Sequence, residues 1–204
     1  GSGKTSPFRM LTTLPYPEER AITVIGFNPV KDYKPIRRCV GYMPGRFSLY
    51  PDLSVEENLE FFATLFGTTV QENYRLIEAI YKQIEPFKKR KAGKLSGGMK
   101  QKLALSCALI HKPVVLFLDE PTTGVDPVSR KEFWEMLRRL KQEGITMLVS
   151  TPYLDEIKPC ARMAFLYQGE LKGIDTPAVM LHRFAGVLCQ TGLQREEAGL
   201  QQES

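Results

Sequence analysis

The stretch "PVVLFLDE", residues 113–120, is a continuous apolar run that ends in two carboxylates. Such a run is typical of a strand in the middle of a parallel sheet, where both faces of the strand are buried. In open α/β sheets, ligands bind outside the carboxyl ends of the strands. The run therefore predicts a central strand that presents Asp119 and Glu120 where a ligand would lie.

The flanking sequence alternates between helix and strand patterns. Residues 95–111 predict a helix capped by Ser96, and residues 129–144 predict an amphipathic helix that ends at Gly144. Residues 145–150 and 162–167 predict further strands, as do residues 21–27, which are followed by a loop over 28–38. This alternation indicates an α/β fold with a mostly parallel sheet and helices on both faces.

Residues 48–94 interrupt this pattern with helices alone. Ser54 and Glu57 form a capping box that opens a helix ending at Gly67, and a second helix is predicted from about Val70 to Ile84. We therefore expect a small helical subdomain at 48–94, inserted in a core formed by 1–47 and 95–183. The polar tail, 184–204, is expected to be disordered.

Composition excludes several classes of protein. The chain has 204 residues, 43% hydrophobic and 25% charged, which is ordinary for a globular domain. No apolar run approaches the roughly 20 residues of a membrane-spanning helix. The four cysteines are far apart and the histidines are only two, so neither a disulfide framework nor a zinc site is predicted. The basic stretch at 85–94 lacks interleaved aromatic residues, so we interpret it as a solvated helix end and expect no nucleic-acid partner.

The first six residues, "GSGKTS", have two interpretations. A Gly-Ser-Gly run is commonly a flexible linker or a cloning scar. Gly-Lys-Thr is also the end of the phosphate-binding loop G-x-x-x-x-G-K-[ST], whose first half would precede residue 1. The six residues alone do not decide between the two.

Two further motifs have both a structural and a functional interpretation. Asp119 and Glu120 could simply cap a loop, but beside a phosphate loop the first acid would hold Mg²⁺ and the second would polarise a water. "LSGG", residues 95–98, could be a plain helix cap. It also leaves a bare helix N-terminus that could bind a γ-phosphate, and a second phosphate site on one chain suggests a nucleotide held by a partner.

In order along the chain, these motifs resemble the nucleotide-binding domain of ABC transporters, over residues 1 to about 183. "LSGGMKQ" resembles the family's signature, "VVLFLDEP" its Walker B strand, and "TTGVDP" its D-loop with Asp126. The stretches "GYMPGRFSLYPDLSVEENL" and "STPYLDE" look closest to ATPases of bacterial ABC-2-type multidrug exporters. The resemblance implies the RecA-like fold of P-loop NTPases and makes "GSGKTS" the end of a Walker A loop. We therefore expect the family's first strands and adenine-stacking aromatic residue to precede residue 1.

The resemblance also implies an ATPase that uses ATP and Mg²⁺, with Glu120 as the general base and Mg²⁺ held by Thr5 and Asp119. The residues expected to surround the phosphates are Gly1, Ser2, Gly3, Lys4, Thr5 and Ser6. Those expected to face the ATP of a partner are Leu95, Ser96, Gly97 and Gly98.

The implied partners are a second ABC ATPase domain, identical, different or in the same chain, and transmembrane permease subunits. The implied location is cytoplasmic, peripheral on the inner face of the cell membrane.

Two positions depart from the family pattern. Gly45 stands where the Q-loop usually carries Gln, and Pro152 stands where a switch His usually follows Ser-Thr. Neither can supply the usual contact to metal, water or γ-phosphate. This leaves an alternative function, a degenerate ATP-binding module that supplies its signature to a partner without efficient hydrolysis of its own ATP. A non-transport ABC protein is a third interpretation, which the compact insertion at 48–94 disfavours.

Overall fold

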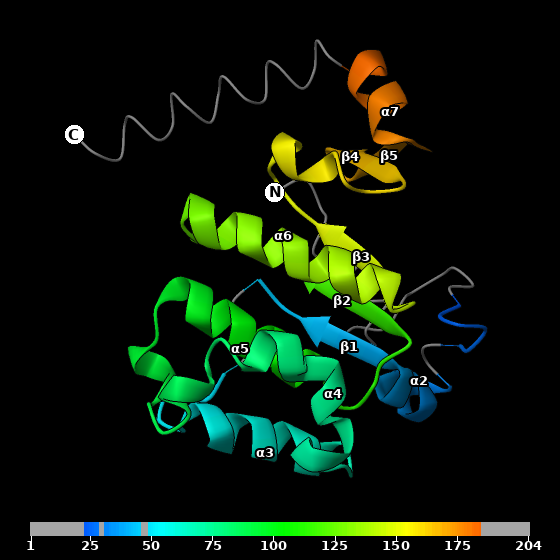
Figure 1. The fold of residues 1–204 in the computed structure, drawn as a ribbon. Helices are drawn as coiled ribbons and strands as arrows, with labels where there is room; N and C mark the ends of the chain where they lie inside the picture. The colour runs from blue at the N-terminus through cyan, green and yellow to red at the C-terminus, as the bar shows by residue number, and fades with distance from the viewer. Residues whose placement is uncertain (1–22, 29–30, 46–48, 185–204) are drawn as a thin grey trace. The chain divides into compact units, whose positions relative to one another are not determined.

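The computed structural model describes residues 23–28, 31–45 and 49–184 (Figure 1). The described residues up to Pro152 form one compact unit, and those from Tyr153 onward form a second. The predicted phosphate-loop residues 1–6 and the tail residues 185–204 lie outside the described residues.

A three-stranded parallel sheet is the centre of the larger unit. Its order is β1 (Val40–Met43), β2 (Val115–Asp119) and β3 (Thr146–Ser150), so the strand predicted from "PVVLFLDE" is the middle one (Figure 1). Leu116 and Leu118 are fully buried on one face of β2, and Phe117 is 4% exposed on the other. Burial of both faces explains why the sequence of this strand is continuously apolar rather than alternating.

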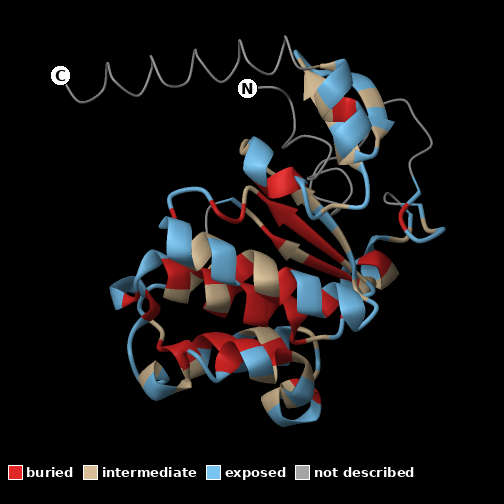
Figure 2. Cartoon of the chain, turned by 45° about the horizontal axis from the view of Figure 1, so that its top comes forward, coloured by how far each residue is buried: buried red, intermediate tan, exposed pale blue. Residues whose placement is uncertain are grey.

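Helices cover both faces of this sheet, as the sequence predicts. On the face of Leu116, α5 (Gly97–Leu109) and α6 (Pro127–Gln142) contribute to the large apolar cluster, and Figure 2 shows buried residues along these helices and the sheet. On the face of Phe117 lies α2 (Tyr33–Cys39), whose Ile36 is fully buried. The larger unit therefore has an α/β fold with helices on both faces of its sheet.

The sequence prediction of a loop over 28–38 is wrong, because α2 occupies Tyr33–Cys39. Pro35 lies in the first turn of this helix, where a backbone N–H would have no partner within the helix, so the proline costs no helical hydrogen bond. Burial of Ile36 against Phe117 supplies the packing energy that local propensity does not indicate.

The predicted strand over 21–27 is also wrong for its described part. Val24 and Phe27 pair across a tight turn, through two backbone hydrogen bonds of 2.9 and 3.0 Å. Ile25 and Gly26 at the centre of this turn have φ of 54° and 80°, in the left-handed region. The glycine makes this turn accessible, and an apolar pattern gives no sign of it.

Two helices occupy the middle of the chain, where helices are predicted: α3 (Val55–Leu65) and α4 (Val70–Tyr81), followed by the short 3₁₀ helices η1 (Glu85–Phe87) and η2 (Ala92–Lys94). The capping box of Ser54 and Glu57 is confirmed, and Thr69 with Glu72 forms a second one. α4 ends at Tyr81, three residues before the predicted end at Ile84. That residues 48–94 are a separate subdomain stays a prediction.

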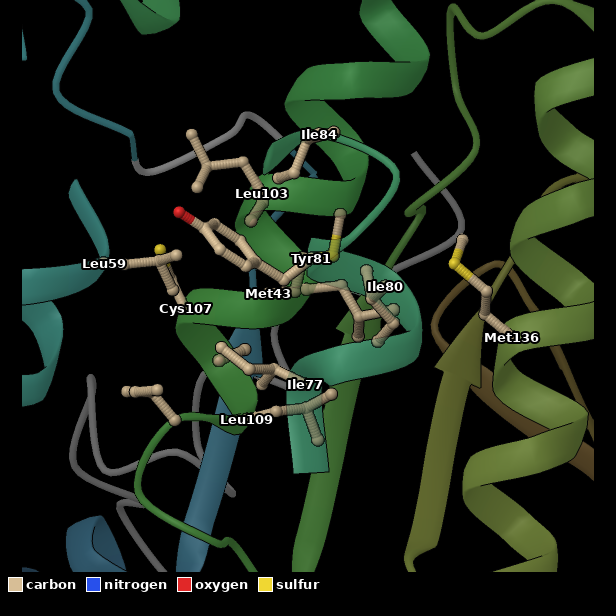
Figure 3. Close-up of a cluster of buried hydrophobic side chains, with 14 of the residues drawn as sticks. Met43, Leu59, Ile77, Ile80, Tyr81, Ile84, Leu103, Cys107, Leu109 and Met136 are labelled. Atoms are coloured by element: carbon tan, nitrogen blue, oxygen red, sulfur yellow. The ribbon is translucent and has the colours of Figure 1, made fainter. Parts of the chain in front are cut away.

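These helices share the core of α5. Figure 3 shows Leu59 from α3, Ile77 and Ile80 from α4 and Leu103 from α5 in one apolar cluster, all at most 3% exposed. α5 also lies directly on β1, since a Cβ built at Gly41 would be only 2.5 Å from the carbonyl oxygen of Ala108. The position of α5, and with it the "LSGG" motif, is therefore fixed from several sides.

The smaller unit contains η3 (Leu154–Ile157), an antiparallel hairpin of β4 (Met163–Tyr167) and β5 (Glu170–Asp175), and α7 (Pro177–Arg183). β4 matches the strand predicted over 162–167, but it pairs with β5 in a separate two-stranded sheet. Gln168 and Gly169 form the turn, both with positive φ, as a two-residue hairpin loop requires. Among the described residues, no helix has the length and apolarity needed to span a bilayer.

Candidate ATP site at the carboxyl end of the sheet

The carboxylate of Asp119 is at the carboxyl end of β2 and is held by the neighbouring strand. Asp119 pairs in register with Ser150, the last residue of β3. The Ser150 hydroxyl donates to Oδ1 of Asp119 at 2.6 Å, and the two residues are 6% and 4% exposed. This hydroxyl is neutral, so the charge of the carboxylate is not offset by the bond that holds it.

Glu120 follows in a backbone conformation that separates it from Asp119. Its φ is 47°, in the left-handed region, and its N–H donates to the carbonyl oxygen of Ser150 at 2.9 Å. Its side chain is partly exposed, and the Thr123 hydroxyl lies 3.4 Å from Oε2. The two successive acidic residues thus differ in burial, since Asp119 is buried and Glu120 is partly exposed, which suits them to different chemical roles.

These residues fit a magnesium-dependent phosphate site. A buried carboxylate that is held in place by a neutral hydroxyl is a suitable hard ligand for Mg²⁺, directly or through water. Among the described residues there is no group of three or more His, Cys, Asp or Glu side chains that could hold a metal alone. A magnesium ion at this edge would keep several water or phosphate ligands, as Mg²⁺ commonly does.

Gly45, the first departure from the family pattern, lies directly against these acids. A Cβ built at Gly45 would be 3.0 Å from the carbonyl oxygen of Asp119 and 3.8 Å from Cβ of Glu120. The structure thus brings this position to the site, although glycine has no side chain to reach into it. Pro152, the second departure, is two residues beyond Ser150 on the chain that leaves β3.

The "LSGG" residues divide into exposed and buried ones. Ser96 caps α5, accepting a hydrogen bond from the N–H of Met99 at 3.3 Å, and both Ser96 and Gly97 are exposed. Leu95 and Gly98 are buried. The exposed pair can present the helix N-terminus to an external ligand, whereas Leu95 and Gly98 pack inside the unit.

Asp126, the predicted D-loop acid, is the N-cap of α6. It accepts the backbone N–H of Ser129 at 2.9 Å, and this bond is the main reason that the pKa of Asp126 lies below its usual value. The helix begins at Pro127, two residues before the predicted start at Ser129. A helix can begin at Pro127 because proline is favourable at the first helical position, where its missing N–H would have no partner within the helix.

Sequence reasoning missed two residues that organise this region. The sequence predicts Ser150 only as the end of a strand, because its pairing with Asp119 depends on strand register. Gln101 has no predicted role within "LSGGMKQ", yet it is fully buried and its amide donates to the carbonyl oxygen of Pro121 at 2.7 Å. The signal available is helical spacing, because Gln101 lies three residues after Gly98 and four before Leu105, on the face that α5 buries.

A parallel sheet with this acid pair at its carboxyl edge, in one unit with a serine-capped Ser-Gly-Gly helix, has the α/β architecture of P-loop nucleotide-binding domains. The family model described as "ABC transporter" matches residues 1–123, more than half of the chain. The chain belongs to the ABC transporter family.

Relatives of known name agree with this membership. The chain is 46% identical over 190 residues to the "Probable multidrug ABC transporter ATP-binding protein YbhF" of Escherichia coli (strain K12), covering 91% of this chain and 32% of that protein. It is 36% identical to "Nod factor export ATP-binding protein I" of Burkholderia thailandensis, covering 91% of this chain and 62% of that protein. It is 35% identical to "ABC transporter ATP-binding protein NatA" of Bacillus subtilis (strain 168), covering 84% and 71%.

Solved structures show the same fold. The "Structure of ATP binding subunit of ABC transporter" matches with a TM-score of 0.79 and 27% identity, over 90% of this chain and 78% of that one. The ATP-binding cassette MJ0796, dimeric and bound to ADP and Pi, matches with a TM-score of 0.75 and 25% identity, over 86% and 81%.

Proposed function

We propose that this chain is the ATP-hydrolysing part of a membrane exporter, and that it closes head-to-tail on a second such domain around ATP. The observation that carries the proposal is the Asp119–Ser150 pair, with Glu120 directly after it at the carboxyl edge of the sheet. The family membership and the similarity to a dimeric cassette support it.

In this proposal the chain's own residues bind the phosphates of ATP, hold the Mg²⁺ and accept a proton from water. Residues 1–6 surround the phosphates, with Lys4 paired to their oxygens, and Thr5 and Asp119 hold the Mg²⁺. Bound Mg²⁺ neutralises charge on the phosphates. Glu120, which is partly exposed, accepts a proton from the attacking water.

The exporter part of the proposal rests on relatives. Proteins named for multidrug transport and for Nod factor export are 46% and 36% identical to this chain. By analogy we propose that transmembrane permease subunits are partners and that the domain is peripheral on the cytoplasmic face of the membrane. This chain spans 32% and 62% of the length of those two relatives.

The test is a pair of variants in the full-length protein, Glu120→Gln and Lys4→Ala. Glu120→Gln should keep Mg²⁺-ATP binding, because the amide has nearly the same shape, while its hydrolysis at this site falls roughly 10²–10⁴-fold. Lys4→Ala should weaken binding itself. If ATP affinity, measured by titration of labelled ATP, is unchanged in Lys4→Ala, the phosphate-site assignment is wrong.

A second candidate, the degenerate module, is favoured by Gly45 and Pro152. The Gly45 position lies against both acids and carries no side chain, so one positioning group is missing from the chain's own site. Loss of one such contact commonly lowers the rate roughly 10²–10⁴-fold. In the assembled transporter, Ser96→Arg should then cost more ATPase activity than Glu120→Gln, because Ser96 serves the opposite site. The opposite ranking would show that the chain's own site is the active one.

A further inference from the structure

The start of α5 is in close contact with the chain that follows Glu120. A Cβ built at Gly98 would be 2.5 Å from Oγ and 2.8 Å from Cβ of Ser129, at the start of α6. One turn further along α5, the Gln101 amide donates to the carbonyl oxygen of Pro121 at 2.7 Å. These two contacts join the helix that carries the Ser-Gly-Gly motif to the segment that carries Glu120.

The Gln101 contact is poorly explained by stability. Gln101 is fully buried, and its Oε1 has no hydrogen-bond partner among the described residues. The hydroxyl of Thr122, the residue after Pro121, is also buried and without a described partner. An apolar side chain of similar shape would remove this unpaired acceptor but would leave the carbonyl oxygen of Pro121 unpaired, so the two effects on stability largely offset each other. What the amide provides is a fixed position of Pro121 relative to α5, because its donated hydrogen bond joins the two.

We propose that Gln101 is a positioning residue that couples the two ATP sites of the assembled dimer. It joins Ser96 and Gly97, which serve the partner's nucleotide, to the turn after Glu120, which serves the chain's own. This inference rests on the proposed head-to-tail ATPase. A displacement of the turn after Glu120 is transmitted through Pro121 and Gln101 to the N-terminus of α5. A displacement of that N-terminus is transmitted to the turn along the same path.

The test is Gln101→Met in the full-length protein assembled with its partner domain. Methionine keeps the length of the side chain and removes both the donor and the unpaired acceptor. We expect kcat for ATP to fall roughly 10-fold or more, because a small misplacement of reacting groups lowers the rate of the chemical step. KM and the melting temperature should change little. Without nucleotide, the N–H groups of Thr123 and Val125, which close the turns after Glu120, should exchange with deuterium several-fold faster.

Asn73 offers a matched control at the other end of α5. Its amide is also buried and donates to a backbone carbonyl at 2.7 Å, that of Ile110 at the C-cap of α5. Asn73→Leu should lower the melting temperature but leave kcat and the exchange of Thr123 unchanged. If Gln101→Met keeps wild-type kcat and exchange, or if Asn73→Leu lowers kcat equally, Gln101 has no positioning role.

Coupling itself is tested in two backgrounds that each silence one site. Gln101→Met should lower the remaining ATPase activity both with Glu120→Gln and with Ser96→Arg. A decrease in one background only would overturn the coupling and leave a local effect. A wild-type assembly without ATPase activity would instead refute the proposed function, while deuterium exchange at Thr123 would still test the contact of Gln101.

Discussion

The hydrogen bond between Ser150 and Asp119 is the contact on which the site geometry most depends, and Ser150→Ala removes it. The bond is short, at 2.6 Å, and both residues are at most 6% exposed, so water does not easily replace the lost donor. Hydrogen bonds to charged groups contribute about 1.5–3 kcal/mol. The bond from the N–H of Glu120 to the carbonyl oxygen of Ser150, at 2.9 Å, survives the substitution. We therefore expect a loss of about 2 kcal/mol in the free energy of unfolding.

The assay is thermal and urea unfolding of the full-length domain without nucleotide, followed by circular dichroism. For a domain of this size, about 2 kcal/mol corresponds to a decrease of about 4–8 °C in the melting temperature. Ser106→Ala is the matched control, because Ser106 is fully buried and donates to a neutral acceptor, the carbonyl oxygen of Lys102, at 2.9 Å. It should cost about 1 kcal/mol.

Two results bear on the mechanism of the Ser150 effect. Ser150→Thr should recover most of the stability, because threonine keeps the hydroxyl and favours strands. With the Asp119 carboxylate less well held, Ser150→Ala should also raise the Mg²⁺ concentration that half-saturates ATPase activity. A Ser150→Ala domain no less stable than Ser106→Ala would refute the idea that Ser150 holds a charged carboxylate.

Three other predictions concern packing, pH and thiol reactivity. Gly98→Ala should destabilise the domain in urea, because a steric cost of about 1–3 kcal/mol against Ser129 exceeds the gain of up to about 1 kcal/mol in helix propensity. Adding Ser129→Gly should restore part of the lost stability. No recovery in the double variant would refute the contact. The N–H of Ser54 is the main cause that holds the pKa of Glu57 below its usual value, so its contribution is present above the unfolded pKa and is lost as pH falls through the folded one. Between about pH 5 and pH 3, the wild type should therefore lose more stability than Glu57→Gln, and equal losses would contradict this. Burial raises the pKa of the Cys107 thiol far above its usual range, so iodoacetamide should label Cys107 only on unfolding, as peptide mass spectrometry would show, and rapid labelling of the folded domain would refute its burial.

The sequence alone was sufficient for elements whose patterns are local. "PVVLFLDE" predicts a buried central strand with acids at its end, because burial on both faces demands a continuous apolar run. Ser54 with Glu57 marks a helix start, because a capping box satisfies backbone groups within four residues of chain. The order of "GSGKTS", "LSGGMKQ" and "VVLFLDEP" predicted the family for the same reason, since each motif is contiguous.

What the tertiary structure decided are relations between segments far apart in the chain. The register of β2 and β3 places Ser150 beside Asp119, and no local pattern encodes a register between strands 31 residues apart. α2 forms because Ile36 is buried against the sheet, which outweighs a sequence that reads as a loop. The bond between Gln101 and Pro121 exists because α5 and the turn after Glu120 are packed together, and only the folded chain brings that donor to that carbonyl.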